Sequence, residues 1–211
     1  MLNEVVTDFI SKDNTIIVGP TGNGITSLTL HFINCLLATD KFILYYNPTK
    51  EIDKEFVKKF YPRVYKDVLF YQGDLGNFIN LLTHIEYNVD HIVIDPGDPT
   101  MVNNKIIPLL VSILKKGHKK TKLLMTSQIR QDPTNGGQVY SPLEKLNMYN
   151  SYELFKYSIW VRNITDSDDD FIPRYVDVFD KVRQGNQYIR RYMTKFSKKE
   201  GNVVAWKEFI K

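Results

Sequence analysis

Short apolar runs with the character of β-strands alternate with longer helix-like runs through the first 127 residues of the sequence. The strand-like runs are continuously apolar rather than alternating, which is typical of strands covered on both faces. This order predicts an α/β fold with a doubly wound, mostly parallel sheet. The five predicted strands are TIIVGP (15–20), KFILYYN (41–47), DVLFYQG (67–73), HIVIDPGD (91–98) and TKLLMTS (121–127).

The pattern changes after the fifth strand. Residues 129–148 contain two prolines and a glycine pair without a clear period, and such a long stretch inside a compact domain is usually functional or mobile. Strand-like runs joined by short turns then predict a C-terminal antiparallel extension of the same sheet, at 157–164, 174–184 and 187–196. Since no linker or repeat divides the chain, we expect residues 1–211 to form one domain.

The composition narrows the function classes only slightly. A net charge of +4 and a pI near 8.9 are compatible with a nucleic-acid partner and do not require one. The single cysteine, Cys35, can form no internal disulfide, which favours a reducing compartment. The sequence shows no secretory signal and no apolar run of the ~18–20 residues that a membrane span needs. We therefore expect a cytoplasmic protein without a membrane partner.

The first motif is VGPTGNGITS at residues 18–27, which nearly fits the phosphate-loop pattern G-x-x-x-x-G-K-[ST]. In that pattern backbone N–H groups at a helix N-terminus bind phosphates, and the hydroxyl of Thr26 would bind Mg²⁺. Ile25 stands where the lysine belongs, which removes a charged hydrogen bond worth roughly 1.5–3 kcal/mol. A tight turn that packs a helix on a sheet is the alternative. The predicted nucleotide-binding residues are Gly19, Pro20, Thr21, Gly22, Asn23, Gly24, Ile25, Thr26 and Ser27.

Two later strands end in polar residues that could complete such a site. Asp95 ends the apolar strand HIVID, as the Mg²⁺-binding carboxylate of a Walker B strand does. Gln128 follows the strand TKLLMTS, where an amide could sense a γ-phosphate. Strands commonly end in polar residues, so an ordinary strand end remains the alternative for both.

The 129–148 segment has the residue types of a groove for single-stranded nucleic acid. Arg130, Gln138, Tyr140 and Lys145 offer charge, an amide and a ring on which a base can stack.

Together these motifs resemble the RecA-type recombinase core, and most closely its trimmed, single-domain phage forms. The resemblance covers residues 10–197 and implies ATP and Mg²⁺ as ligands and single-stranded DNA as partner. It also implies self-association or assembly with a related ATPase subunit. Gln128 would couple the γ-phosphate to a DNA-binding loop that carries the Gly136–Gly137 pair. Lys181 and Arg183, in the sequence KVR, would reach the ATP of a neighbouring subunit.

The sequence departs from this family at two catalytic positions. Besides Ile25, the family's water-polarising glutamate is missing: Asn47 lies nearest its place, and Glu51 is the carboxylate close by. An amide can position water but cannot accept its proton as a general base. We therefore expect a RecA-like DNA-binding recombination or repair protein of phage or viral type, with weakened ATP binding and hydrolysis. The alternatives are a non-catalytic structural or adaptor subunit, and a helicase or genome-packaging motor ATPase.

Overall fold

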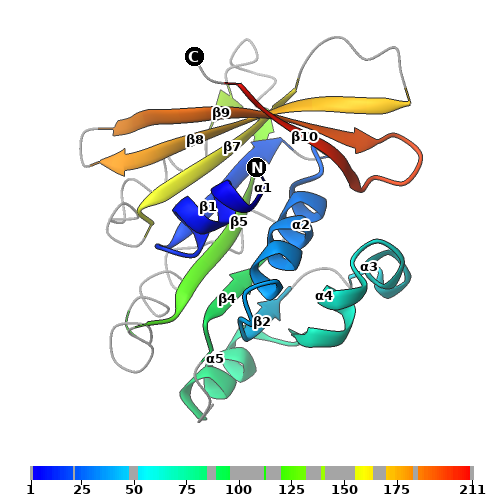
Figure 1. The fold of residues 1–211 in the computed structure, drawn as a ribbon. Coiled ribbons are helices and arrows are strands. Elements are labelled where there is room, and N and C mark those ends of the chain that lie inside the picture. The colour runs from blue at the N-terminus through cyan, green and yellow to red at the C-terminus, as the bar shows by residue number, and fades with distance from the viewer. Residues whose placement is uncertain are drawn as a thin grey trace.

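The structure, a computed structural model, describes residues 2–20, 22–47, 52–84, 89–95, 112, 120–131, 139–140, 155–163, 170–182 and 185–209. These residues form a ten-stranded sheet in the order β10-β9-β8-β7-β1-β5-β4-β2-β3, with β6 paired to β5 (Figure 1). The strands are β1 (Thr15–Pro20), β2 (Ile43–Tyr46), β3 (Val68–Tyr71), β4 (His91–Ile94), β5 (Lys122–Gln131), β6 (Val139–Tyr140), β7 (Tyr157–Asn163), β8 (Phe171–Val182), β9 (Gly185–Ser197) and β10 (Val203–Phe209). The helices are α1 (Leu2–Val5), η1 (Val6–Ile10), α2 (Ile25–Leu37), α3 (Lys54–Phe60), α4 (Pro62–Asp67) and α5 (Leu75–His84).

The sheet has a parallel and an antiparallel half, as predicted. β1 pairs in parallel with β5 and β7, β4 with β5 and β2, and β2 with β3. The four strands from β7 to β10 pair antiparallel in chain order. A mostly parallel sheet with an antiparallel C-terminal extension is therefore confirmed. The extension has one strand more than the sequence predicted, because β10 follows β9.

Each face of the parallel half has its own hydrophobic core. Ile17, Val93 and Leu124 point into the larger core, together with side chains of α2, α3 and α4. Their strand neighbours Ile16 and Met125 point into the smaller core with Phe78 and Leu82 of α5. Helices on both faces explain why these strands are continuously apolar. In the described part of the chain, no helix is long and apolar enough to cross a membrane.

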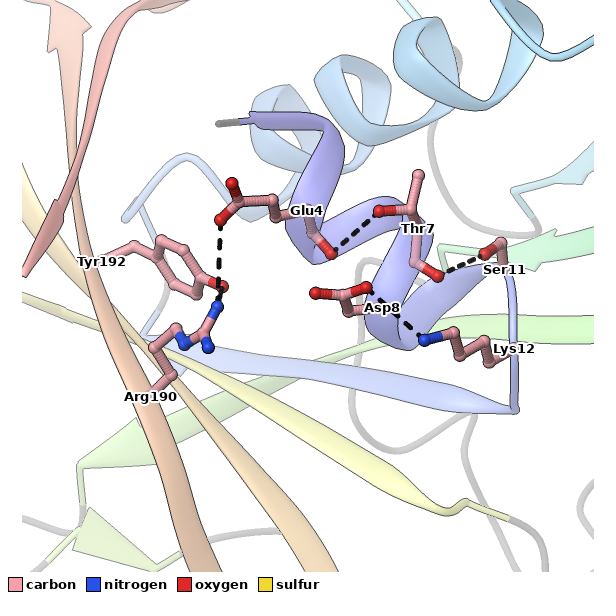
Figure 2. A network of polar contacts seen from close by, with 7 residues as sticks. All are labelled: Glu4, Thr7, Asp8, Ser11, Lys12, Arg190 and Tyr192. Atoms are coloured by element: carbon pink, nitrogen blue, oxygen red, sulfur yellow. Dashed lines mark hydrogen bonds and ion pairs between the residues drawn. The ribbon is translucent and has the colours of Figure 1, made fainter. Parts of the chain in front are cut away.

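The N-terminal segment closes the larger core near β9. α1 continues directly into the π-helical turn η1, and Val5 and Phe9 are buried. Figure 2 shows the polar contacts of this segment: Glu4 lies 3.8 Å from Arg190, whose guanidinium donates a 3.5 Å hydrogen bond to the hydroxyl of Tyr192. The segment therefore contacts the antiparallel extension through both apolar packing and charge.

The sheet order brings the predicted motifs to one edge. β5 lies between β1 and β4, so the carboxyl ends of these three parallel strands meet there. In the register of the sheet, Gly19 lies beside Gln128, and Ile94 lies beside Met125. The glycine-rich loop, the residue after β4 and the outer part of β5 are therefore neighbours.

Candidate functional site

The glycine-rich loop leads from β1 into α2 through two left-handed glycines. Gly22 and Gly24 have φ angles of 81° and 74°, which side-chain-bearing residues rarely adopt. Gly24 is the N-cap of α2, and no side chain of the described residues caps this end of the helix. The N-terminus of a thirteen-residue helix thus retains N–H groups for an acceptor, the arrangement that binds phosphates.

The loop is also packed tightly against the antiparallel half of the sheet. A Cβ atom on Gly24 would lie 2.7 Å from the ring of Phe196 in β9. A Cβ atom on Gly19 would lie 2.9 Å from the carbonyl oxygen of Val161 in β7. Both glycines therefore allow close packing of the loop on the sheet. This packing is what the alternative interpretation, a tight turn between a strand and a helix, requires, and it is present whether or not the loop binds a ligand.

Asp95 is the centre of the site. Its carboxylate is 2% exposed and accepts hydrogen bonds from three hydroxyls on three different elements. Thr26 of α2 and Tyr45 of β2 donate to Oδ2 over 2.9 and 2.7 Å, and Thr126 of β5 donates to Oδ1 over 2.5 Å. The structure therefore joins Thr26 and Asp95, the two residues predicted to hold Mg²⁺, in a direct contact. Tyr45 and Thr126 hold the carboxylate from β2 and β5.

The hydroxyl of Tyr45 remains a donor over the whole physiological pH range. Burial is the main cause that raises its pKa well above the ordinary value of 10, and the negative charge of Asp95 adds to it. The side chain of Asn47 hydrogen-bonds to the same hydroxyl. Asn47 is 7% exposed and lines a pocket of about 360 Å³, whose polar lining includes Lys54 and Gln72. This pocket adjoins the Asp95 cluster through Tyr45.

Ile25, at the position where the predicted motif would have lysine, is part of the core. Ile25 is 6% exposed and belongs to the larger hydrophobic cluster. Its Cδ1 atom would lie 3.3 Å from a Cβ atom on Gly19. The residue that replaces the lysine thus packs between the loop and the sheet and brings no charge to the site.

A neutral donor of the loop is buried and has no partner among the residues that the structure describes. Asn23 is 5% exposed, and its Nδ2 atom donates no hydrogen bond within that part of the chain. Because such a group loses hydration without compensation, an acceptor supplied by a ligand would stabilise it. This orphaned amide fits a phosphate oxygen beside the N-terminus of α2.

The donor set also fits a cation of the Mg²⁺ type, provided that phosphates complete its coordination. Mg²⁺ is commonly held by one or two carboxylates together with substrate phosphates. Hydroxyls of the described residues occupy three of the four lone pairs of the Asp95 carboxylate, and the fourth, on Oδ1, is left for a cation. If Thr26 turned its hydroxyl oxygen toward the ion, a lone pair on Oδ2 would also become free. Among the described residues, no group of three or more His, Cys, Asp or Glu side chains could hold a metal by itself.

The remaining predicted residues are placed only in part. Gln128 and Arg130 are backbone positions of β5, and Arg130 pairs antiparallel with Tyr140 of β6. Lys181, one of the last two residues of β8, pairs with Asn186 of β9. Pro20 ends β1, and Ser27 lies in the first turn of α2. Predicted residues outside the described part of the chain are Thr21, Glu51, Gly136, Gly137, Gln138, Lys145 and Arg183.

Sequence reasoning missed Tyr45, Thr126 and the orphaned amide of Asn23 as distinct members of the site. A signal existed for Thr126, which lies at the end of a strand beside the phosphate-loop strand, but Tyr45 carries no pattern that separates it from the other buried aromatic residues. Compared with protein-family models and with curated proteins, the sequence matches none of them. The assignment of this site therefore depends on its geometry.

Proposed function

We propose that this protein is a RecA-like DNA-binding recombination or repair protein of phage or viral type that binds Mg²⁺–ATP weakly and hydrolyses it slowly. The observation that carries the proposal is the 2.9 Å hydrogen bond between Thr26 and the buried Asp95. It joins the glycine-rich loop to the end of β4 across the intervening strand β5. A hydroxyl and a carboxylate meeting beside a helix N-terminus are the parts that a Mg²⁺-bound polyphosphate requires.

Each residue of the site has a separate task in this function. The N–H groups at the start of α2 and the amide of Asn23 would bind phosphate oxygens, and Thr26 and Asp95 would hold the cation. Tyr45 and Thr126 fix the carboxylate of Asp95 so that its free lone pair stays in place. Bound ATP would supply the charged γ-phosphate to which the protein responds.

Slow hydrolysis follows from the residues around Asn47. Its amide can orient a water molecule but cannot take the proton that a nucleophilic water must lose. Asp95 is already engaged by three hydroxyls and is poorly placed to serve as that base. Such a site is suited to a switch, in which nucleotide occupancy changes the affinity for DNA. Gln128, beside Gly19 on the strand that pairs with β6, is the residue through which we expect this coupling.

The experiment is a titration with a fluorescent ATP analogue, with and without Mg²⁺, followed by single-stranded DNA in the same buffers. Thr26→Ala should remove the Mg²⁺-dependent part of nucleotide binding, whereas Thr39→Ala, in the turn after α2, should not. Nucleotide binding that is equal with and without Mg²⁺, or equal in wild type and Thr26→Ala, would contradict the proposed site.

One observation favours a second function, a non-catalytic subunit that keeps the fold for assembly. Ile25 is packed in the core, and the ring of Phe196 lies against Gly24, as expected for a loop that has become purely structural. The same titration separates the two, because a structural subunit would bind neither the nucleotide nor DNA. The motor-ATPase alternative needs a cation at the phosphates, and the described residues of the loop, Gly19–Pro20 and Gly22–Ser27, contain none.

A further inference from the structure

The antiparallel half of the sheet turns one face toward the larger core. On the opposite face Trp160 of β7 packs partly against the smaller core, whereas the rings of β8 and β9 on that face belong to neither core. Val161, Val176 and Tyr192 point from β7, β8 and β9 into the larger core, on the side where α1 and α2 lie (Figure 1). Because neighbouring residues on a strand point to opposite faces, the residues between them form the outer face. A register shift between Val178 and Phe179 skips one residue of β9, so that Tyr188 lies opposite Phe179 on that face. In most antiparallel sheets such a face is polar. Here it is aromatic.

Aromatic rings follow one another across three strands of this outer face. Trp160 of β7 contacts Phe179 of β8 with ring centroids 6.1 Å apart, and Phe179 contacts Tyr188 of β9 at 5.7 Å. Tyr175 and Phe171 lie further along β8 on the same face. Tyr188 and Phe171 are 43% and 37% exposed, so rings of this set are open to contact. We call these five rings the aromatic face.

Cations lie over the rings of the aromatic face. The guanidinium of Arg191 is 4.7 Å from the ring centre of Tyr175, that of Arg162 is 5.8 Å from Trp160, and the ammonium of Lys195 is 5.9 Å from Phe171. These cation–ring contacts hold the positive groups close to the surface of the sheet.

One buried carboxylate orders the two arginines. Arg191 donates to both oxygens of Asp177 over 2.6 and 3.1 Å, and the Nε atom of Arg162 lies 3.2 Å from Oδ2. Asp177 is 1% exposed, whereas the side chain of Arg162 is 50% exposed. A guanidinium has five N–H donors, so both arginines keep donors for an external anion. Among the described side chains of this face, positive groups outnumber the carboxylate three to one, and the face carries an excess of positive charge.

We propose that the aromatic face binds single-stranded nucleic acid, with bases stacked on its rings and phosphates on Arg162, Arg191 and Lys195. Rings supply a surface for any base, and cations neutralise the backbone, a combination that characterises sequence-tolerant single-strand binding. A duplex would not fit, since its bases are already stacked on one another. The inference rests on the proposed function for the class of partner, and it assigns that partner to β7, β8 and β9 in addition to the 129–148 segment.

The test is fluorescence anisotropy of labelled oligo(dU) and oligo(rU) with the full chain, at low and at high salt. Phe171→Ala should weaken binding roughly 5- to 150-fold, the range expected for loss of one stacked base. Phe42→Ala is the matched control, because Phe42 has the same exposed fraction of 37% and lies just before β2, away from the aromatic face. Tyr188→Ala should weaken binding similarly, and Tyr188→Phe, which keeps the ring, should restore it.

Charge is tested separately from stacking. Lys195→Gln should lower the slope of log affinity against log salt by about 0.7, the value for one phosphate contact on a single strand. Lys66→Gln on the exposed side of α4 should leave the slope unchanged. Melting temperatures close to that of the wild type would establish that the variants are folded.

The possible results separate this inference from the proposed function. Equal losses with oligo(dU) and oligo(rU) would support single-stranded nucleic acid of either kind, and a larger loss with oligo(dU) would support DNA. If the wild type binds oligo(dU) and the face variants bind it equally well, the aromatic face is wrong as the site and the DNA partner stands. If the wild type binds neither oligonucleotide, the partner is wrong in both proposals, and nucleotide binding is judged from the titration with Mg²⁺.

Discussion

Replacing Ile25 with lysine should change stability and nucleotide affinity in opposite directions. Ile25 is 6% exposed and packs close to Gly19, so a longer side chain must displace its neighbours. Overpacking of this kind costs about 1–3 kcal/mol, and at roughly 2–4 °C per kcal/mol for a chain of this size the melting temperature without ligand should fall. The adjacent Thr26 is exposed, so the new ammonium group can extend from the core toward the mouth of the loop.

With Mg²⁺–ATP present, the same substitution should be favourable. A charged hydrogen bond to a phosphate contributes about 1.5–3 kcal/mol, which corresponds to roughly 10- to 150-fold tighter binding. The increase in melting temperature caused by Mg²⁺–ATP should therefore be larger for Ile25→Lys than for the wild type. Differential scanning fluorimetry and titration with a fluorescent ATP analogue measure the two effects independently.

Ile25→Met is the control, because it fills a similar volume without charge. Ile25→Met should lower the free energy of unfolding by less than about 1.5 kcal/mol and leave nucleotide affinity unchanged. Equal affinity of the lysine and methionine variants would refute the reasoning, since it would mean that residue 25 does not reach the phosphates and that the loop lacks a phosphate-binding shape.

Three further predictions concern the surroundings of the site and the outer sheet. In urea unfolding, Gly24→Ala should lower the free energy of unfolding more than Gly22→Ala. An alanine with positive φ costs about 1–2 kcal/mol at either position, but only Gly24 also lies against a ring of β9. Arg191→Met should lower the free energy of unfolding by about 2–4 kcal/mol, because Arg191 donates hydrogen bonds to both oxygens of the buried Asp177. Arg162→Met should lower it by less than about 1 kcal/mol, because the side chain of Arg162 is half-exposed. Burial lowers the pKa of His91 from 6.5 to about 4, so between these pH values the unfolded chain binds a proton that the folded chain does not. The free energy of unfolding should therefore fall by up to about 3 kcal/mol as the pH drops from 6.5 to 4. His91→Phe should remove that part of the acid sensitivity, measured by unfolding at a series of pH values.

The central strands and the convergence of Thr26 with Asp95 were predictable because their signals are local. Continuous apolar runs identify buried parallel strands, and the carboxyl ends of such strands meet at one edge. The glycine spacing before α2 then marks where a helix N-terminus must lie. From these elements the sequence indicates that the loop and the end of β4 are neighbours.

Other features could not be predicted because they depend on contacts between distant segments. β10, VVAWKEF, is not among the predicted strands, and its pairing with β9 makes it one. The sequence shows that Ile25 lacks a charge, but only the packed structure shows it in the core. Likewise, no local pattern tells which hydroxyls face Asp95, because Tyr45 and Thr126 reach it from two other strands.

The place of β1 in the sheet has a consequence for how the chain is made. β1 is synthesised before both of its neighbours in the sheet, because β5 and β7 begin only at Lys122 and Tyr157. Until those segments leave the ribosome, neither edge of the apolar segment of β1 can form its native hydrogen bonds, and such an unpaired segment is prone to aggregation. Pairings so far apart in sequence also make folding slow. Nascent chains of this protein should therefore depend on chaperones until β7 has emerged.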